Sequence, residues 1–269
     1  MTSLSSLAAL ALAATTPHGT TLGEILPGIY TNEEQAYFER DAGLTPPSWI
    51  ALKIEKQGAD LIVTRTDAFG KAVSAPLKGF AAVGVERDSL TLDKCSRNFD
   101  RTDAGWTYSA LQNKKACHQD YQIIEVTTDG VKLRFADGSE TQLKRARPVE
   151  CWAAARKTQP KADGSPDWLF VQKLDLHDQG GRVMVGGGDS GAEPLILRMR
   201  AVHWPKPSTN RPSMVLYVHK ADNPDSAVSY SWADIDASRV GLNLRWMQAS
   251  CTIKGAERAS DVKAADFRG

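Results

Sequence analysis

The chain has 269 residues, enough for one large all-β domain or two smaller ones. Hydrophobic residues make up 42% of it and charged residues 24%, a balance that supports a sizeable core and excludes disorder as the first interpretation. Its 33 basic residues nearly equal its 32 acidic ones. Because there is no basic excess or stripe, we expect no nucleic-acid partner.

Residues 1–22 are expected to be a signal peptide and tail. An apolar stretch from Leu7 to Ala14 follows a start free of acidic residues, and it is too short to span a bilayer but suits the core of a secretory signal. A disordered or helical tail is the alternative. No later stretch approaches ~18 apolar residues, so we expect a periplasmic or secreted protein with no transmembrane segment after processing.

One helix is predicted in the segment GIYTNEEQAYFERDAG. Thr31 is expected to cap the first turn, with Glu34 reaching back to the Thr31 amide. Gly43 offers a stop. The Pro46-Pro47 pair then favours an extended entry into the next strand.

The first half of the chain is dominated by alternating apolar and polar residues, which predict strands. Asp129-Gly130 and Asp137-Gly138 supply hairpin turns, so residues 121–145 are predicted to form a three-stranded antiparallel meander. The strands expected here are 49–53, 60–66, 89–93, 121–127, 131–135 and 141–144.

Four cysteines, Cys95, Cys117, Cys151 and Cys251, occur without a Cys-x-x-Cys pair. An even count without that spacing favours two disulfides over a zinc or redox site. We expect the pairs Cys95–Cys117 and Cys151–Cys251, which would agree with export. Four buried free thiols are the alternative.

Residues 158–166 are polar and rich in Pro and Gly, and they are predicted to be a linker or long loop. They would separate a barrel region, 23–157, from a second β-rich half, 167–254, followed by a charged tail, 255–269. The strands expected in the second half are 168–176, 182–185, 194–204, 213–220 and 240–248.

Ser190 lies in a Gly-Asp-Ser-Gly sequence, which resembles the surroundings of the nucleophile in trypsin-like serine proteases. Such a nucleophile needs a histidine base held by an acid. The closest approach to the family's Ala-His-Cys box is the reordered Ala116-Cys117-His118. We therefore interpret the segment as a glycine-rich connecting loop. Lacking histidines at fixed spacing, the chain is also expected to have no metal site and no cofactor.

A candidate ligand site lies on the hairpin of 194–204 and 213–220. A register that groups the apolar residues on one face puts Arg198 beside His219 and Arg200 beside Tyr217 on the other. Two arginines, a tyrosine and a histidine could clamp an anionic group such as a carboxylate. A solvated sheet face is the alternative. The chain also has seven tryptophans, expected mainly in a β-barrel or sandwich core.

The segment GIYTNEEQAYF carries a Gly-x-Tyr-x-Asn-x-x-Gln pattern at Gly28, Tyr30, Asn32 and Gln35. A region with two cysteines and an aromatic-glycine loop follows at 88–133. Together these features resemble the CpeT/CpcT family of phycobiliprotein chromophore lyases, over about the first 155 residues. The resemblance implies a lipocalin-like antiparallel barrel that forms a calyx.

The fold class expected is therefore mainly β: a lipocalin-like antiparallel barrel with a short N-terminal helix and a second β-rich half. The function expected is non-catalytic binding of a small flat or amphipathic ligand in the calyx. Its contacts would come from Arg198, Arg200, Tyr217 and His219. A bilin lyase-like transferase and an envelope interaction protein without a ligand are the alternatives.

Overall fold

The computed structural model describes residues 20–85, 87–111, 117 and 119–255. The segment expected to be a signal peptide, apart from its last three residues, and the tail beyond residue 255 lie outside the described residues. The fold is mainly β, as predicted. Among the described residues, no helix has the length and apolar character needed to cross a membrane.

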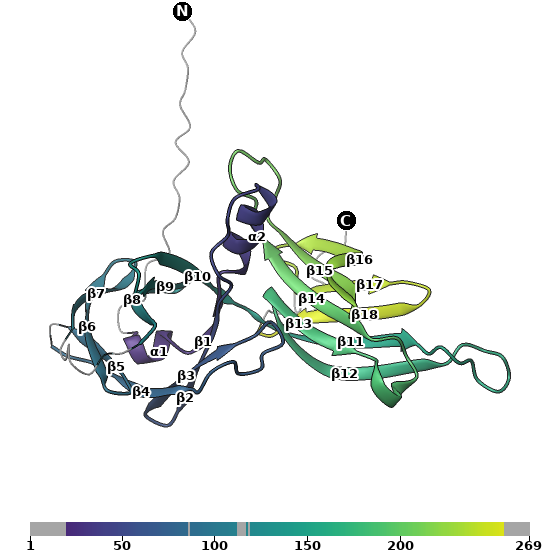
Figure 1. Ribbon diagram of the computed structural model, residues 1–269, viewed down its shortest axis with the longest axis horizontal. Helices are drawn as coiled ribbons and strands as arrows, with labels where there is room; N and C mark the ends of the chain where they lie inside the picture. The colour runs from purple at the N-terminus through teal and green to yellow at the C-terminus, as the bar shows by residue number, and fades with distance from the viewer. Residues whose placement is uncertain (1–19, 86, 112–116, 118, 256–269) are drawn as a thin grey trace, which may run out of the picture.

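The first half is a closed barrel of ten antiparallel strands, in which β1 lies between β2 and β10 and the other strands follow in chain order. Figure 1 shows the ring that they form. Its strands are β1 (Gly28–Thr31), β2 (Ala51–Gln57), β3 (Asp60–Thr66), β4 (Leu77–Ala82), β5 (Asp88–Leu92), β6 (Cys95–Thr102), β7 (Gly105–Leu111), β8 (Tyr121–Thr127), β9 (Gly130–Phe135) and β10 (Glu140–Ala146).

The predicted meander is confirmed as β8, β9 and β10, but its two glycines serve different purposes. Gly138 has a φ of +85°, the positive value that favours glycine in a hairpin turn. At Gly130 a Cβ atom would lie 2.1 Å from the Leu143 carbonyl oxygen, so the residue allows a close approach of two backbones. Both Asp-Gly pairs therefore lie at turns between strands of the meander, as predicted.

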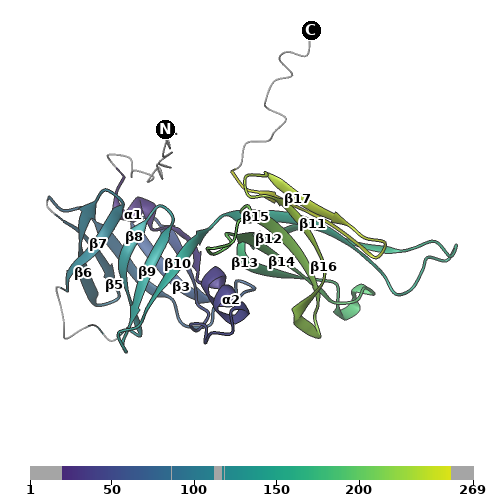
Figure 2. The same cartoon turned by 90° about the horizontal axis from the view of Figure 1, so that it is seen from above.

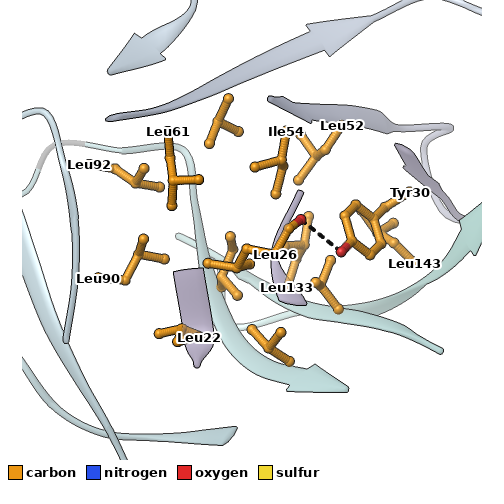
Figure 3. Packing of buried hydrophobic residues seen from close by; sticks show 14 of the residues in the cluster. Leu22, Leu26, Tyr30, Leu52, Ile54, Leu61, Leu90, Leu92, Leu133 and Leu143 are labelled. Carbon is orange, nitrogen blue, oxygen red and sulfur yellow. Dashed lines mark hydrogen bonds between the residues drawn. The ribbon is translucent and has the colours of Figure 1, made fainter. Parts of the chain in front are cut away.

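The interior of the barrel is filled by apolar side chains and by a short helix, α1 (Leu22–Ile25). Leu22 and Leu26 pack among inward-facing strand residues such as Leu52 and Leu133 (Figure 3). The buried Tyr30 hydroxyl donates a hydrogen bond to the Leu26 carbonyl oxygen, at 2.8 Å. The Tyr30 hydroxyl is thus paired at the edge of an apolar cluster.

The second half is a sandwich of two four-stranded antiparallel sheets, in the orders β12-β11-β18-β17 and β13-β14-β15-β16. Apolar residues from both sheets, among them Val149, Leu197 and Met214, form one buried cluster between them. The strands are β11 (Pro148–Arg156), β12 (Trp168–His177), β13 (Gln179–Val185), β14 (Leu195–Val202), β15 (Ser213–Lys220), β16 (Asn223–Asp234), β17 (Arg239–Asn243) and β18 (Met247–Ile253).

The boundary between the halves differs from the predicted linker. Residues 158–166 connect β11 to β12, which are paired neighbours in one sheet, so they form a hairpin loop within the sandwich. The change from barrel to sandwich occurs at Arg147, between the end of β10 and the start of β11. Arg147 donates through its backbone N and its Nε to the buried Asp178 carboxylate, at 2.7 and 2.5 Å.

Both expected disulfides are present, one in each half. Cys95–Cys117 closes 22 residues of the barrel, and Cys151–Cys251 spans 100 residues of the sandwich. Cys151 and Cys251 are directly opposite partners on β11 and β18. Adjacent antiparallel strands bring paired Cβ atoms within reach of such a bond.

The predicted helix is α2 (Glu33–Asp41), but its start differs from the expectation. Thr31 ends β1 and Asn32 is the N-cap. The Thr31 hydroxyl accepts the Glu33 amide, at 3.1 Å, while the Glu34 carboxylate turns away to Lys144 and His203. The capping-box carboxylate is instead Glu24 of α1, which accepts the Thr21 amide at 2.8 Å.

Candidate functional site

The outer face of the sheet β13–β16, on the side away from the sandwich core, carries a row of large polar and aromatic residues. Strand pairing places Arg182 opposite Arg198, Arg198 opposite Tyr217, and Tyr217 opposite Tyr230. Helix α2, which belongs to the barrel half in sequence, lies between the barrel and this sheet (Figures 1 and 2). The candidate site is the space between α2 and the sheet.

Glu33, the first residue of α2, enters the arginine cluster. Its Oε1 forms an ion pair with Arg198 Nη2 and lies 3.6 Å from Arg200 Nε. Gly180 makes room for this carboxylate, because a Cβ atom there would lie 2.6 Å from Glu33 Cδ. Trp49 Nε1 donates to the second carboxylate oxygen, at 2.8 Å. Four residues from three segments therefore surround one buried carboxylate.

Aromatic rings hold the guanidinium groups in place. The Arg200 guanidinium carbon lies 3.7 Å from the centroid of the Tyr37 ring, and that of Arg198 lies 5.8 Å from the Tyr217 ring. Stacking on aromatic faces suits the flat guanidinium group. These contacts orient the arginines without using their N–H donors.

A cleft of about 740 Å³ opens beside this cluster. Its inner wall contains Arg182 and Arg198, and its mouth carries the exposed Arg40, Asp41 and Asp225. The full lining is Glu33, Ala36, Tyr37, Arg40, Asp41, Trp49, Ala68, Arg182, Arg198 and Asp225. The cleft is thus bordered by α2, the barrel loops and the sheet.

The buried part of the site has more positive than negative charge. Arg198 is 8% and Arg200 2% exposed, Arg182 is half-buried, and the only carboxylate in contact with the two buried guanidiniums among the described residues is that of Glu33. Several buried donors, Arg182 Nε, Arg198 Nε and Arg200 Nη2, have no hydrogen-bond partner in the described part of the chain. Such donors favour an anion.

His219 lies at the end of the same face and is 1% exposed. Within the described residues, neither of its ring nitrogens makes a well-aligned hydrogen bond. Burial lowers the pKa of His219 to about 4, and the charges of Arg198 and Arg182 act in the same direction, against smaller opposite effects of Ser226 and Asp225. Burial and the charge of Arg198 also lower the pKa of Arg182.

The four residues predicted to bind a ligand do share one face of the β14–β15 hairpin, but two details of the prediction were wrong. The register is shifted by two residues: Arg198 faces Tyr217, Arg200 faces Val215, and Ile196 faces His219. The four residues also lie on the sandwich and not inside the barrel. The shift arises because the connecting loop, 203–212, is longer than expected.

Sequence reasoning missed Glu33, Tyr37 and Arg182 as members of the site. Glu33 was assigned only to the start of a helix, and it lies 165 residues from its partner Arg198. The sequence did contain a signal for Arg182. It lies two residues before Met184, in a strand next to the predicted hairpin. That spacing could have placed it on the same face as Arg198.

Ser190 is in a turn, η2 (Gly188–Ser190), between β13 and β14. Its hydroxyl accepts the Ala192 amide, at 3.2 Å. Gly187 and Gly191 on either side have φ values of +83° and +73°. These contacts describe a tight glycine-rich connection, as the sequence indicated.

The residues of the Gly-x-Tyr-x-Asn-x-x-Gln pattern have structural contacts at the start of α2. Asn32 accepts the Ile50 amide at 2.9 Å and donates to the Ser48 carbonyl oxygen at 2.9 Å, so it ties β1 to β2. The Gln35 side chain accepts the Thr141 hydroxyl, at 3.2 Å. A smaller cleft of about 390 Å³ lies beside them, with Glu34 between His203 and Lys144.

No family model, curated protein or solved structure matches this chain. The resemblance to the CpeT/CpcT family therefore stays a prediction.

Proposed function

We propose that the protein binds a small anionic ligand, one that carries a carboxylate or phosphate group, in the cleft beneath α2, without transforming it. The observation that carries the proposal is the group of three arginines, Arg182, Arg198 and Arg200, around the single carboxylate of Glu33. Arg182 and Arg198 line the cleft, Arg200 lies behind them, and each of the three has a buried nitrogen without a hydrogen-bond partner among the described residues. An anion there would satisfy donors that are otherwise desolvated at a cost of about 1–3 kcal/mol each.

Guanidinium groups suit this task because each offers several donors in a fixed plane, which matches the geometry of carboxylate and phosphate oxygens. Here two of the planes are also held by aromatic rings, so little side-chain entropy is lost when an anion binds. The half-buried setting of the cleft strengthens the attraction relative to a surface site.

The barrel serves as the support for this site in the proposal. Its interior is occupied by α1 and apolar side chains, while its helix α2 supplies Glu33 and Tyr37 to the cleft. The ligand therefore occupies the junction of barrel and sandwich, where concave sites commonly occur, and not the calyx expected from the sequence.

We also propose that the protein acts in an oxidising compartment outside the cytoplasm. The support is the pair of disulfides, which use all four cysteines of the chain. Such bonds persist in the periplasm and in secreted proteins and are rare in the cytosol. Mass spectrometry of alkylated protein from its natural source tests this proposal, and free thiols at these positions would contradict it.

The binding proposal is tested by thermal unfolding of the full chain with phosphate, sulfate or citrate, at an ionic strength matched with chloride. A ligand that binds the native state raises the Tm, and the stabilisation grows with the logarithm of the ligand concentration once that exceeds the Kd. We expect at least one of these anions to raise the Tm of the natural protein and to lose most of that effect in Arg198→Met. The control is Arg134→Met, which removes an arginine from an exposed ion pair on the barrel.

A Tm increase of the same size in both variants would contradict the proposal, because it would show a general salt effect. So would the absence of any increase beyond chloride with all three anions. Circular dichroism of each variant establishes that it is folded before the comparison is made.

A further inference from the structure

The row of residues that begins with the arginines continues across the sheet as a set of aromatic rings. The Tyr217 ring lies 6.2 Å from Tyr230, and Tyr230 lies 5.9 Å from Trp232 between ring centroids. Trp232 in turn is nearly parallel to Trp204, with 19° between the ring planes and 6.1 Å between their centroids. We call Tyr217, Tyr230, Trp232 and Trp204 the aromatic row.

The far end of the aromatic row is open to solvent. Tyr230 is 59% and Trp232 46% exposed, although apolar surface of this kind is usually buried. The rings are nevertheless held in place: Tyr230 meets Trp232 edge to face at 90°, and Phe38 of α2 packs on Trp204 at 5.8 Å. The result is a fixed aromatic surface with exposed faces.

The exposed faces of Tyr230 and Trp232 are by themselves smaller than a stable protein interface. Fully exposed aromatic side chains offer about 150–250 Å² each, so Tyr230 and Trp232 together present on the order of 200 Å². A stable protein interface needs about 800 Å² from each partner. The aromatic row is therefore of a size for one or two rings of a small ligand.

The solvent exposure of the aromatic row indicates which kind of ring it is suited to bind. A flat apolar ring is best bound in an enclosed slot that buries both of its faces. A ring that stacks on an open surface keeps its second face in water, which suits a sugar: one face presents C–H groups, and the hydroxyl groups around it remain hydrated. The exposed Asp225 and Asp234 at the two ends of β16 could accept hydrogen bonds from such hydroxyls.

Arg198, Tyr217 and Tyr230 are successive cross-strand neighbours on β14, β15 and β16. Because neighbouring strands lie about 4.8 Å apart, the first and last of these positions are separated by roughly 10 Å. A ligand of two or three linked sugar rings with a carboxylate group can reach from the cleft to the aromatic row.

We infer that the ligand of the cleft is an acidic oligosaccharide, which places a carboxylate on the arginines and stacks a sugar ring on Tyr230 and Trp232. This inference rests on the proposed function, since it uses the same arginines. It adds the aromatic row as a second contact and names the class of ligand.

The experiment titrates the full chain with three probes: trigalacturonic acid, the neutral trisaccharide cellotriose, and inorganic phosphate. Calorimetry measures each Kd in the natural protein and in Arg198→Met, Trp232→Ala and Trp232→Phe. Trp246→Ala is the matched control, because Trp246 is another partly exposed tryptophan, at 38%, outside the row. Trp232→Phe keeps a ring and so separates a lost contact from a lost fold.

We expect trigalacturonic acid to bind more tightly than phosphate and cellotriose. Trp232→Ala should weaken its binding about five- to tenfold, in line with the contribution of one aromatic contact, while Trp232→Phe loses less and Trp246→Ala nothing. Phosphate binding should be unaffected by the Trp232 variants and lost in Arg198→Met.

If phosphate binds and depends on Arg198, but trigalacturonic acid binds no more tightly and ignores Trp232, the inference is overturned and the proposed function stands. Equal binding of cellotriose would also overturn it, because the carboxylate would then contribute nothing. If no probe binds, both the inference and the proposed function fail.

Discussion

The barrel interior and the part of the outer face of the sheet β13–β16 that carries the arginines are both buried, yet they differ in the kinds of residue that fill them. The barrel encloses a cluster of leucine, isoleucine, valine and aromatic side chains with one buried arginine, Arg97, and its buried Trp106 donates to Asp88 at 2.7 Å. The sheet face encloses Arg198, Arg200 and His219, with several polar atoms left unpartnered within the described residues.

The two regions therefore contribute differently to stability: burial of the apolar barrel residues stabilises the fold, whereas burial of the charged residues costs free energy. Each Å² of apolar surface buried in the barrel contributes about 25 cal/mol to folding. Buried charges cost several kcal/mol each to desolvate, and their mutual attraction offsets this only in part. Methionine could fill the volume of Arg198 at lower cost, so stability alone does not account for the arginines, and under the proposed function they are there for the anion.

The largest expected effect compares the disulfides of the two halves. Loop entropy predicts that the 100-residue bridge Cys151–Cys251 stabilises by about 5 kcal/mol and the 22-residue bridge Cys95–Cys117 by about 3 kcal/mol. Urea unfolding of the two double Cys→Ser variants measures both values. A larger loss for the barrel bridge would contradict the ranking by loop length.

The next effect concerns the single carboxylate in the arginine cluster. Glu33→Gln should destabilise the protein by about 3 kcal/mol, because it leaves buried guanidinium charge uncompensated. Saturating phosphate should recover part of that loss, since the anion would replace the carboxylate. The double variant Glu33→Leu/Arg198→Met should lose less stability than Glu33→Gln, because only Arg200 is then left without its carboxylate, and it should respond less to phosphate.

Urea unfolding with and without phosphate checks these three expectations. A barrel variant, Leu133→Ala, gives the contrast: it should lose about 2–5 kcal/mol through its cavity, without any recovery by phosphate. Recovery of Leu133→Ala by the same anion would mean that phosphate acts on the whole protein and not at Glu33.

The smallest effect, taken per pH unit, is a pH dependence that belongs to the sandwich. Burial lowers the pKa of His177 and of His219 to about 4, from 6.5. Because the unfolded chain takes up these protons first, stability is fully present above about pH 6.5 and is lost as the pH falls toward 4. Each histidine contributes a slope of about 1.4 kcal/mol per pH unit in that window.

Urea unfolding at pH 7, 6, 5 and 4.5 measures this slope. His219→Gln should remove about half of it and leave the part that belongs to His177. An unchanged slope in His219→Gln would show that the pKa of His219 is the same in the folded and the unfolded chain, which would contradict the effect of burial on this residue.

The sequence predicted well those strands that are specified by residues close together in the chain. The strands Asp60–Thr66 and Tyr121–Thr127 have the predicted bounds, because period-two alternation and turn residues specify them within a few positions. β6 (Cys95–Thr102) was missed because Arg97 interrupts the apolar residues on its inward side and Phe99 is its only large apolar residue. The 240–248 segment proved to be parts of two strands, β17 and β18, separated by a turn.

The candidate site was predictable only in part, for the same reason. Alternation along one strand put Arg198 and Arg200 on one face, which the pairing confirms. The hairpin register depends on the length of the 203–212 loop, which composition does not specify. The contact between Glu33 and these arginines depends on how the barrel lies against the sandwich. No local sequence pattern specifies that arrangement.

The most direct test of the central claim is nitrogen-15 NMR of the arginine Nε–H groups during a phosphate titration at constant ionic strength. The signals are assigned by single Arg→Lys variants, with Arg134 on the barrel as the internal control. We predict that the Nε–H signals of Arg182 and Arg198 shift along one saturating curve with a common Kd, while that of Arg134 stays in place. Small, unsaturated shifts of similar size at all three arginines would contradict an anion site beneath α2.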